Sequence, residues 1–326
     1  MWLARRLREL IGPLRGQRLC VAYSGGADST ALLAALATLR ARHRLGLRAL
    51  HVNHHLQPAA GAMARSARGR ARQLGVPCQV IDAPVRLVRG ESPEAAARAV
   101  RYGALRARLR AGEWLVLAQH QDDQVESLLL QLLRGAGVAG LAASPARAGM
   151  LLRPLLPMPR AQLLAYLRRR SLGWSEDPSN ADDRYARNFL RLRVIPLLRE
   201  RWPSLGVTLG RSAALAAEAQ QLLAARADAL LVDAVDGEAL RVSVLRRFEA
   251  AERRNVLRRW LQLQGIPMPD QRRLLEVAGP MLRARHDAQP YIRWPGALVR
   301  RRGDRLHAFR EGAAAGGPGE RSGSII

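Results

Sequence analysis

Four short apolar runs in the first half of the chain alternate with stretches of helical spacing. The runs cover residues 19–23, 47–52, 78–81 and 114–118. Each is separated from the next by about the length that a crossover helix needs. Because the runs are continuously apolar, we expect strands covered on both faces, in a doubly wound parallel sheet that binds ligands at the carboxyl ends of its strands.

The second half of the chain has helical spacing and ends in a hairpin pattern. Apolar residues at i, i+3, i+4, i+7 and i+8 from Val125 predict an amphipathic helix that stops at Gly135. Further helices are expected over residues 160–170, 211–230, 245–264 and 270–277, and a hairpin turns at residues 302–304. The predicted fold class is therefore α/β, a doubly wound parallel sheet followed by a smaller C-terminal α+β domain.

These patterns divide the chain into four parts. We expect residues 1–205 to form the domain that contains the parallel sheet, and residues 206–235 to form a linker helix. We expect residues 236–311 to form a small substrate-binding domain. The Gly-, Ala- and Ser-rich residues 312–326 are expected to be disordered.

The net charge of the chain indicates what kind of partner it binds. The formal net charge is +26, and every one of the 53 Lys and Arg positions is arginine. A surplus of this size implies a polyanionic partner, and nucleic acid is favoured because guanidinium groups match phosphate oxygens. The low aromatic content of 4% argues against a dedicated surface for stacking single strands.

The lengths of the apolar runs and the positions of the cysteines predict the location of the chain and the redox state of its thiols. We expect no membrane association, because no apolar run reaches the length of a membrane span. The first eight residues resemble an amphipathic helix with no signal-type apolar core, so a cytoplasmic location is expected. The two cysteines, Cys20 and Cys78, lie inside apolar runs, which suits buried reduced thiols.

The loop after the first apolar run is the strongest chemical signal. It follows a predicted strand and precedes a leucine-rich helix, so its serines and glycines lie where phosphate binds a helix N-terminus. A carboxylate beside phosphates repels them unless a divalent cation lies between, which indicates a magnesium–nucleotide complex. The alternative is a tight turn with a helix cap. The loop residues are Ser24, Gly25, Gly26, Ala27, Asp28 and Ser29.

Two further polar clusters follow the second and fourth runs. Residues 53–55 are Asn-His-His, and residues 119–123 are Gln-His-Gln-Asp-Asp. Asp122 and Asp123 are either helix caps or, near Asp28, part of a magnesium site. His120 either transfers a proton, contacts phosphate or is structural.

Two arginine pairs have a spacing that suits a shared ligand. Arg98 and Arg101 lie three residues apart, and Arg187 and Arg191 lie four apart. Either pair could clamp a phosphate, and solvated arginines are the alternative.

The order and spacing of these motifs resemble those of the bacterial tRNA(Ile)-lysidine synthetases, over residues 16–205 and more weakly over 240–310. The resemblance rests on residues 24–29, 51–54, 94–102, 120–127, 134–135, 153–155, 176–180 and 187–188. It implies an adenine nucleotide alpha hydrolase-like fold with a PP-loop. It also implies an ATP-dependent ligase that adenylates O2 of the wobble cytidine in a CAU-anticodon tRNA(Ile), after which the ε-amine of L-lysine displaces AMP at C2.

The resemblance also assigns roles to residues. It implies that the loop residues, with His51 and Asn53, bind ATP. Asp28 and Asp123 then hold Mg²⁺ at the pyrophosphate. His120, Arg101 and Arg191 act near the transferring phosphate or the target base. The residues expected at the tRNA are Arg187, Asn188, Arg191, Arg254 and Arg258.

Departures and alternatives stay open. Gln119 stands where many relatives have the first of two histidines, and His55 stands where glycine is usual. A tRNA-thiolating enzyme of the same ATP-binding type is one alternative, and a non-catalytic tRNA-binding protein is another. The sequence leaves the oligomeric state open, a homodimer included.

Overall fold

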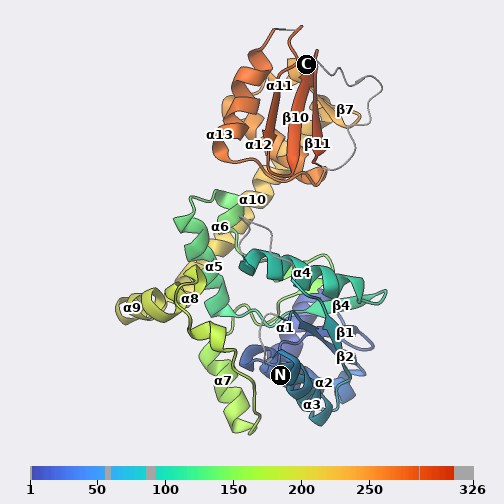
Figure 1. Ribbon diagram of the computed structural model, residues 1–326, viewed down its shortest axis with the longest axis vertical. Coiled ribbons are helices and arrows are strands. Elements are labelled where there is room, and N and C mark those ends of the chain that lie inside the picture. The colour runs from blue at the N-terminus through green and yellow to red at the C-terminus, as the bar shows by residue number, and fades with distance from the viewer. Residues whose placement is uncertain (1, 56–59, 86–92, 286, 312–326) are drawn as a thin grey trace, which may run out of the picture. The chain divides into compact units, whose positions relative to one another are not determined.

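The computed structural model describes residues 2–55, 60–85, 93–285 and 287–311, in two compact units (Figure 1). The first unit spans residues 1–217 and the second spans residues 218–326. The tail expected to be disordered, residues 312–326, lies outside the described residues.

The first unit is built on a six-stranded sheet of order β3-β2-β1-β4-β6-β5. All neighbouring strands pair in parallel except β5 with β6. The four predicted strands are confirmed, with ends that differ by one or two residues from the apolar runs. The strands are β1 (Arg18–Ala22), β2 (Gly46–Asn53), β3 (Cys78–Asp82), β4 (Glu113–Val116), β5 (Arg147–Ala148) and β6 (Leu151–Leu152).

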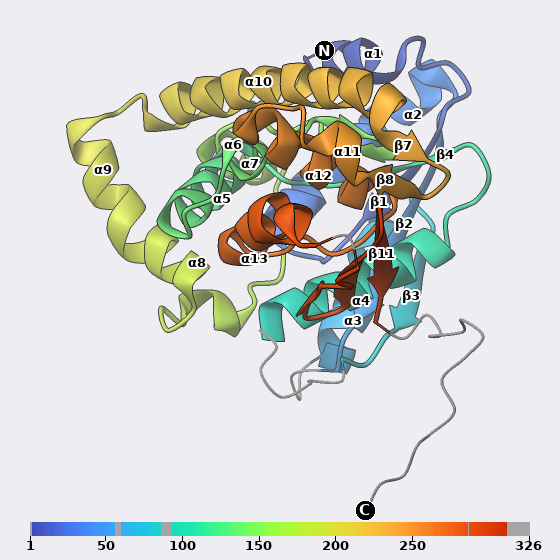
Figure 2. The ribbon, with the colours of Figure 1, turned by 90° about the horizontal axis from the view of Figure 1, so that it is seen from above.

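Helices cover both faces of this sheet, as the continuously apolar strands predict. The crossover helices are α2 (Ala27–His43), α3 (Ala60–Gln73) and α4 (Pro93–Ala107). Figure 1 shows α2 and α3 on one side of the strands and α4 on the other, while α1 (Trp2–Ile11) lies next to α2 (Figure 2). Leu32, Leu33 and Leu36 of α2 are completely buried. Each such side chain stabilises the fold by roughly 1.5–3 kcal/mol.

A helical layer follows the sheet. It has a small core of Val125, Leu190, Ile195 and Leu205. The predicted helix from Val125 is present as α5, but Leu132 and Leu133 in its last turn are 50% and 74% exposed because that turn runs past this core. The elements are α5 (Gln121–Leu133), α6 (Val138–Leu141), α7 (Arg160–Arg169), η1 (Pro178–Ala181), α8 (Ala186–Phe189), η2 (Leu190–Val194) and α9 (Ile195–Arg201).

The long helix α10 (Leu205–Ala234) runs from the first unit into the second. It is longer than the predicted stretch 211–230. Leu205 and Leu209 pack in the small core of the first unit, and Leu231 and Ala234 pack in the core of the second. The helix expected as a linker therefore contributes side chains to both cores.

The second unit packs helices on one face of an antiparallel sheet of order β7-β8-β11-β10-β9. Its core includes Leu257, Trp260, Val299 and Leu306. The predicted hairpin is confirmed, with Gly303 at φ 57° in its turn. The elements are β7 (Val235–Asp236), β8 (Ala239–Arg241), α11 (Val242–Leu245), α12 (Ala250–Leu263), α13 (Gln271–Glu276), η3 (Val277–Met281), β9 (Tyr291–Trp294), β10 (Ala297–Arg302) and β11 (Arg305–Arg310).

The continuous helix predicted over residues 245–264 was wrong at its start. The chain leaves the helix between α11 and α12. The Arg253 guanidinium donates to the carbonyl oxygens of Leu245, at 3.0 Å, and Phe248, at 2.9 Å. A side chain therefore satisfies carbonyls that a continuous helix would bond within its own ladder.

In the described part of the chain, none of the helices combines the length and apolar character that crossing a bilayer requires.

Candidate active site

The carboxyl ends of β1, β2 and β4 open onto a cavity of about 510 Å³. The wall also includes residues of α4 and the start of α5. The predicted site residues that line it are Ser24, Asp28, Ser29, His51, Asn53, Arg101, Asp123 and Arg187. Three clusters that are far apart in the sequence therefore meet at one sheet edge, as the doubly wound topology requires.

The loop between β1 and α2 has the backbone of an anion-binding turn. Gly25 has φ +84°, and a Cβ there would lie 3.0 Å from the Ala67 Cβ, so glycine is required. The Ser24 and Ser29 hydroxyl oxygens are 3.0 Å apart. Gly26 occupies the N-cap position of α2 and no side chain caps this helix. Ser24 Oγ accepts the Gly26 N–H at 3.3 Å and Ser29 Oγ donates to the Gly26 carbonyl at 3.1 Å, so both serines also hold the turn. Both serines line the cavity.

A contact from α3 fixes this loop. The Arg70 guanidinium donates to the Gly25 carbonyl at 3.2 Å and to the Ser175 hydroxyl at 2.6 Å. The Ser175 backbone N–H donates to the same carbonyl at 2.9 Å. The Gly25 carbonyl is thereby bound on the protein side of the loop. A carbonyl turned toward the cavity would repel phosphate.

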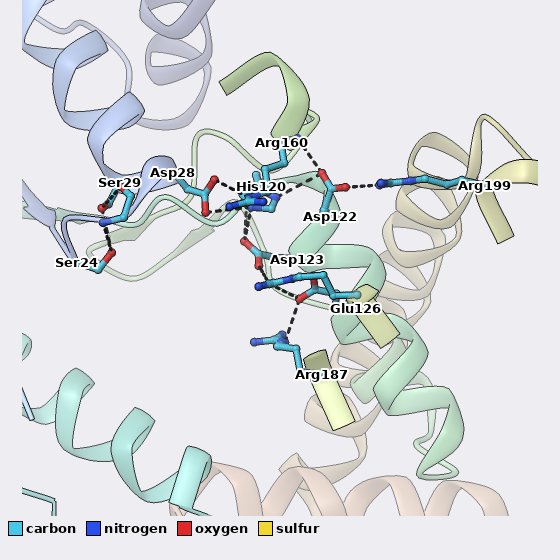
Figure 3. A network of polar contacts seen from close by, with 12 residues as sticks. Ser24, Asp28, Ser29, His120, Asp122, Asp123, Glu126, Arg160, Arg187 and Arg199 are labelled. Atoms are coloured by element: carbon cyan, nitrogen blue, oxygen red, sulfur yellow. Dashed lines mark hydrogen bonds and ion pairs between the residues drawn. The ribbon is translucent and has the colours of Figure 1, made fainter. Parts of the chain in front are cut away.

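His120 lies between the acidic residues (Figure 3). Its Nε2 atom is 3.5 Å from an Asp28 oxygen and 3.5 Å from an Asp123 oxygen, and its Nδ1 atom is 3.6 Å from Asp122. The His120 side chain is 1% exposed. Burial opposes its charge, but the surrounding carboxylates outweigh burial and raise the pKa of His120. Burial would raise the pKa of Asp28, yet His120 and Arg160 lower it.

The two adjacent acids of α5 face different partners. Asp122 accepts the Arg160 backbone N–H at 2.8 Å and pairs with the Arg199 guanidinium. Asp123 accepts the His120 backbone N–H at 3.1 Å and lines the cavity. Asp122 therefore ties α5 to α7 and α9, while Asp28 and Asp123 line the cavity together with Asp177.

Glu126 is a residue that sequence reasoning did not single out. It is 1% exposed and accepts from Arg191 Nε at 2.6 Å and Nη2 at 2.9 Å, with Arg187 Nε at 3.3 Å. Burial raises the pKa of Glu126 although the two arginines oppose the shift. Arg191 also lies 3.6 Å from Asp123. Asp123 and Glu126 lie three residues apart and therefore share one face of α5, and Arg187 and Arg191 lie four residues apart and share another helical face. These two spacings were the sequence signal that could have indicated an ion pair of Glu126 with the arginines.

Histidines and an asparagine form the wall at the end of β2. His51 is buried, and its Nδ1 atom is 2.9 Å from the Tyr23 carbonyl oxygen. Burial lowers the pKa of His51, so its imidazole is neutral near pH 7. Asn53 is also buried and donates to Asp82 at 3.2 Å. The predicted Arg101 donates from Nε to His54 at 3.2 Å, which brings α4 to this wall.

The two departures from the family pattern have structural partners. Gln119 lines the cavity and accepts from the Arg153 guanidinium, which is 7% exposed and also donates to the Pro145 carbonyl at 2.8 Å. His55 has φ 55°, a backbone region that favours glycine, and its Nε2 atom lies 2.7 Å from Asp82.

The remaining residues expected at the tRNA lie outside the cavity wall. Asn188 donates to the Asp182 carbonyl at 2.9 Å and so holds the turn before α8. Arg254 and Arg258 lie on α12 of the second unit, where Arg258 is exposed.

The side chains at the cavity show whether the predicted Mg²⁺ has suitable ligands. Among the described residues no group of three or more His, Cys, Asp or Glu side chains is arranged to hold a metal. The Asp28 and Asp123 side chains are 31% and 19% exposed at the cavity. Two carboxylates fit Mg²⁺ that completes its shell with phosphate oxygens and water.

Comparisons with known proteins match two parts of the chain to two different family models. Residues 2–198 match the family model of the PP-loop domain, and residues 240–307 match that of the TilS substrate binding domain. A tRNA(Ile)-lysidine synthase of Alkalilimnicola ehrlichii is 46% identical over 321 residues, which are 97% of this chain and 72% of the relative. One of Methylococcus capsulatus is 44% identical over 299 residues, 90% of this chain and 68% of the relative.

A solved structure shares the fold. The U34-tRNA thiolase NcsA from Methanococcus maripaludis, described with its [4Fe-4S] cluster, matches with a TM-score of 0.55 and 15% identity. The match covers 66% of this chain and 78% of the thiolase. At this identity the likeness concerns the nucleotide-binding fold alone.

Proposed function

The chain belongs to the tRNA(Ile)-lysidine synthase family, and we propose that it uses ATP to join L-lysine to C2 of the wobble cytidine in a CAU-anticodon tRNA(Ile). The family makes the protein a ligase, and its PP-loop domain supports the use of ATP. One observation carries the proposal: a single cavity is lined by the anion-binding loop, by Asp28 and Asp123 and by Arg187, although these residues are spread over positions 24 to 187 of the sequence.

The first step is adenylation of the cytidine. The O2 atom of the base attacks the α-phosphorus of ATP, an O–P bond forms, and pyrophosphate leaves. The Ser24 and Ser29 hydroxyls and the first N–H groups of α2 bind the phosphates. The bonds from Arg70 and Ser175 keep the Gly25 carbonyl away from them. Bound Mg²⁺, held by Asp28 and Asp123, would neutralise charge on the departing pyrophosphate.

The second step replaces the adenylate. The ε-amine of lysine attacks C2, the C2–O bond breaks, and AMP leaves with that oxygen. Adenylation is needed because the carbonyl oxygen of cytidine is a poor leaving group by itself. We assign Arg191 and Arg101 to the charge that develops on the phosphate. Glu126 fixes Arg191 with two hydrogen bonds, at 2.6 and 2.9 Å, so that the guanidinium is oriented before substrate binds.

His120 lies between Asp28 and Asp123, with its Nε2 atom 3.5 Å from an oxygen of each. Two carboxylates that converge without a cation repel each other. The protonated form of the buried imidazole would offset this repulsion. We therefore assign His120 to positioning the acids.

The thiolating alternative is not favoured. It needs reactive cysteines, and both cysteines of this chain are free, in β1 and β3. Burial raises the pKa of Cys20 to about 12 and that of Cys78 to about 11. Neither thiol is activated. A homodimer and a cytoplasmic location stay predictions.

Transfer of label from ATP to tRNA tests the adenylation step before lysine is added. Incubation with ATP labelled at the α-phosphate, Mg²⁺ and CAU-anticodon tRNA should place label on the tRNA, and added lysine should release it as AMP. A tRNA that differs only by uridine at the wobble position is the matched control. Equal labelling of both tRNAs, or label release without lysine at the same rate, contradicts the proposal.

A further inference from the structure

One face of the sheet in the second unit carries arginines and aromatic rings. The inner face packs on the core through Ala297, Val299 and Leu306. Side chains alternate along a strand, so the neighbouring positions point to the other face. The register places Arg300 beside Tyr291 and His307, Leu298 beside Arg293 and Phe309, and Arg302 beside Arg305. We call these eight residues on β9, β10 and β11 the outer sheet face.

The aromatic rings of the outer sheet face are accessible. Tyr291 is 60% exposed and Phe309 is 43% exposed. The Arg300 guanidinium carbon lies 5.9 Å from the centre of the Tyr291 ring. The His307 and Phe309 rings are stacked, with centres 6.3 Å apart and an angle of 22° between their planes. The face therefore presents flat rings with a cation beside one of them.

The charges of the outer sheet face are largely uncompensated. Of its four arginines, Arg305 pairs with Asp236 at 2.8 Å. Within the described part of the chain, Arg293, Arg300 and Arg302 form no ion pair with a carboxylate. On α12, Arg259 pairs with Asp228, and among the described residues Arg254 and Arg258 have no carboxylate partner either. What distinguishes the sheet is that exposed aromatic rings, Tyr291 and Phe309, lie beside its uncompensated arginines.

We propose that the outer sheet face binds the tRNA substrate, with phosphates on Arg300 and Arg302 and an unpaired base or ribose against Tyr291 or Phe309. Arginines match phosphate oxygens, and sheets with exposed aromatic rings stack RNA bases. A second copy of this chain fits poorly, because it would bring four more arginines onto the same face. The inference rests on the proposed function, which supplies the RNA, and it adds the outer sheet face to the residues expected at the tRNA.

Equilibrium binding of CAU-anticodon tRNA to the full chain tests the surface. The double variant Arg300→Gln/Arg302→Gln should weaken binding about tenfold near 100 mM salt and lower the slope of log K against log salt by about 2, one for each phosphate lost. Tyr291→Leu, which keeps an apolar strand residue, should weaken binding about fivefold with the slope unchanged. Arg272→Gln on α13 is the matched control, since it removes an exposed arginine that pairs with Glu276.

Three outcomes would overturn the inference. The first is an affinity of the double variant within twofold of the parent chain. The second is an equal loss for Arg272→Gln, which would indicate diffuse charge rather than a built surface. The third is a parent chain that sediments as a dimer and a double variant that sediments as a monomer, which would indicate that the face binds a second copy of the chain. Circular dichroism and the melting temperature check that each variant folds.

Steady-state kinetics separates this inference from the proposed function. If both hold, the double variant raises KM for tRNA and leaves kcat and the KM for ATP within twofold, because the reacting groups lie in the first unit. If the parent chain binds tRNA through this face but never adenylates it, the proposed function fails and the surface stands. If the parent chain adenylates tRNA and the double variant has an unchanged KM, the surface fails and the function stands.

Discussion

The Nε2 atom of His120 lies 3.5 Å from a carboxylate oxygen of Asp28. The first residue precedes α5 and the second lies in the first turn of α2, so this contact joins the two helix N-termini that flank the cavity. Against the effect of burial, the neighbouring carboxylates raise the pKa of His120, and His120 lowers the pKa of Asp28, so each group favours the charged form of the other. The loop of residues 24–29 and the acidic cluster are thereby coupled.

Asp28→Asn should abolish adenylation and spare RNA binding. The change removes a carboxylate that we assign to Mg²⁺ and leaves the nearly isosteric amide, so the adenylation rate should fall at least 100-fold. Affinity for tRNA should stay within twofold. Asp183→Asn is the control, because Asp183 pairs with Arg193 outside the cavity. Label transfer and filter binding measure the two quantities, and a large loss of tRNA affinity would instead indicate a structural role for Asp28.

Glu126→Ala should destabilise the chain and slow adenylation. The substitution removes the carboxylate that accepts two hydrogen bonds from Arg191 and leaves a cavity beside the guanidinium. Breaking a buried ion pair lowers the free energy of unfolding by about 3 kcal/mol. Urea unfolding followed by circular dichroism gives the free energy of unfolding. A loss below about 1 kcal/mol together with an unchanged rate would show that Glu126 does not hold Arg191 in place.

Arg70→Met should act on ATP binding more than on catalysis. Without the guanidinium, the Gly25 carbonyl and the Ser175 hydroxyl lose a charged donor, and the loop is no longer fixed. We expect KM for ATP to rise about tenfold, which corresponds to one charged hydrogen bond, and kcat to change less than threefold. Arg70→Lys should recover part of the loss. Arg72→Met, an exposed arginine on the same helix, should change neither constant.

Thiol alkylation should have an unusual pH dependence. The pKa of Cys78 is raised from 9.0 to about 11, so its thiolate fraction at pH 8 is about 100-fold below that of an unperturbed cysteine. The alkylation rate should keep rising about tenfold per pH unit beyond pH 9. The chain unfolded in urea should level off near pH 9. A native rate that also levels off there would contradict the burial of this thiol, and Cys78→Ser assigns the signal.

The strands and the loop could be predicted because their signals are local. An apolar run, two glycines and a following helix occupy adjacent positions around Gly25. The convergence of His120 on Asp28 followed from topology, since parallel strands end at the same sheet edge. The different partners of Asp122 and Asp123 could not be predicted. Neighbouring helix residues point about 100° apart, and which of them faces the cavity depends on α7 and α9.

Other features depend on packing between distant segments. Glu126 has the sequence context of a surface helix residue, and it is buried only because Arg191, 65 residues later, folds onto it. The break before α12 arises because Arg253 takes carbonyls that helical periodicity assigns to the backbone. Low aromatic content argued against a stacking surface, yet Tyr291 and Phe309 lie on the same sheet face. Composition counts residues and does not locate them.

The nucleosides of the product show directly whether lysine is joined to the wobble cytidine. CAU-anticodon tRNA incubated with the chain, ATP, Mg²⁺ and L-lysine is digested and analysed by mass spectrometry. We expect one cytidine to gain the mass of lysine less one water, with fragments that place it at the wobble position, only when ATP is present. An unchanged wobble cytidine, under conditions where an established tRNA(Ile)-lysidine synthase modifies the same tRNA, would contradict the proposed function.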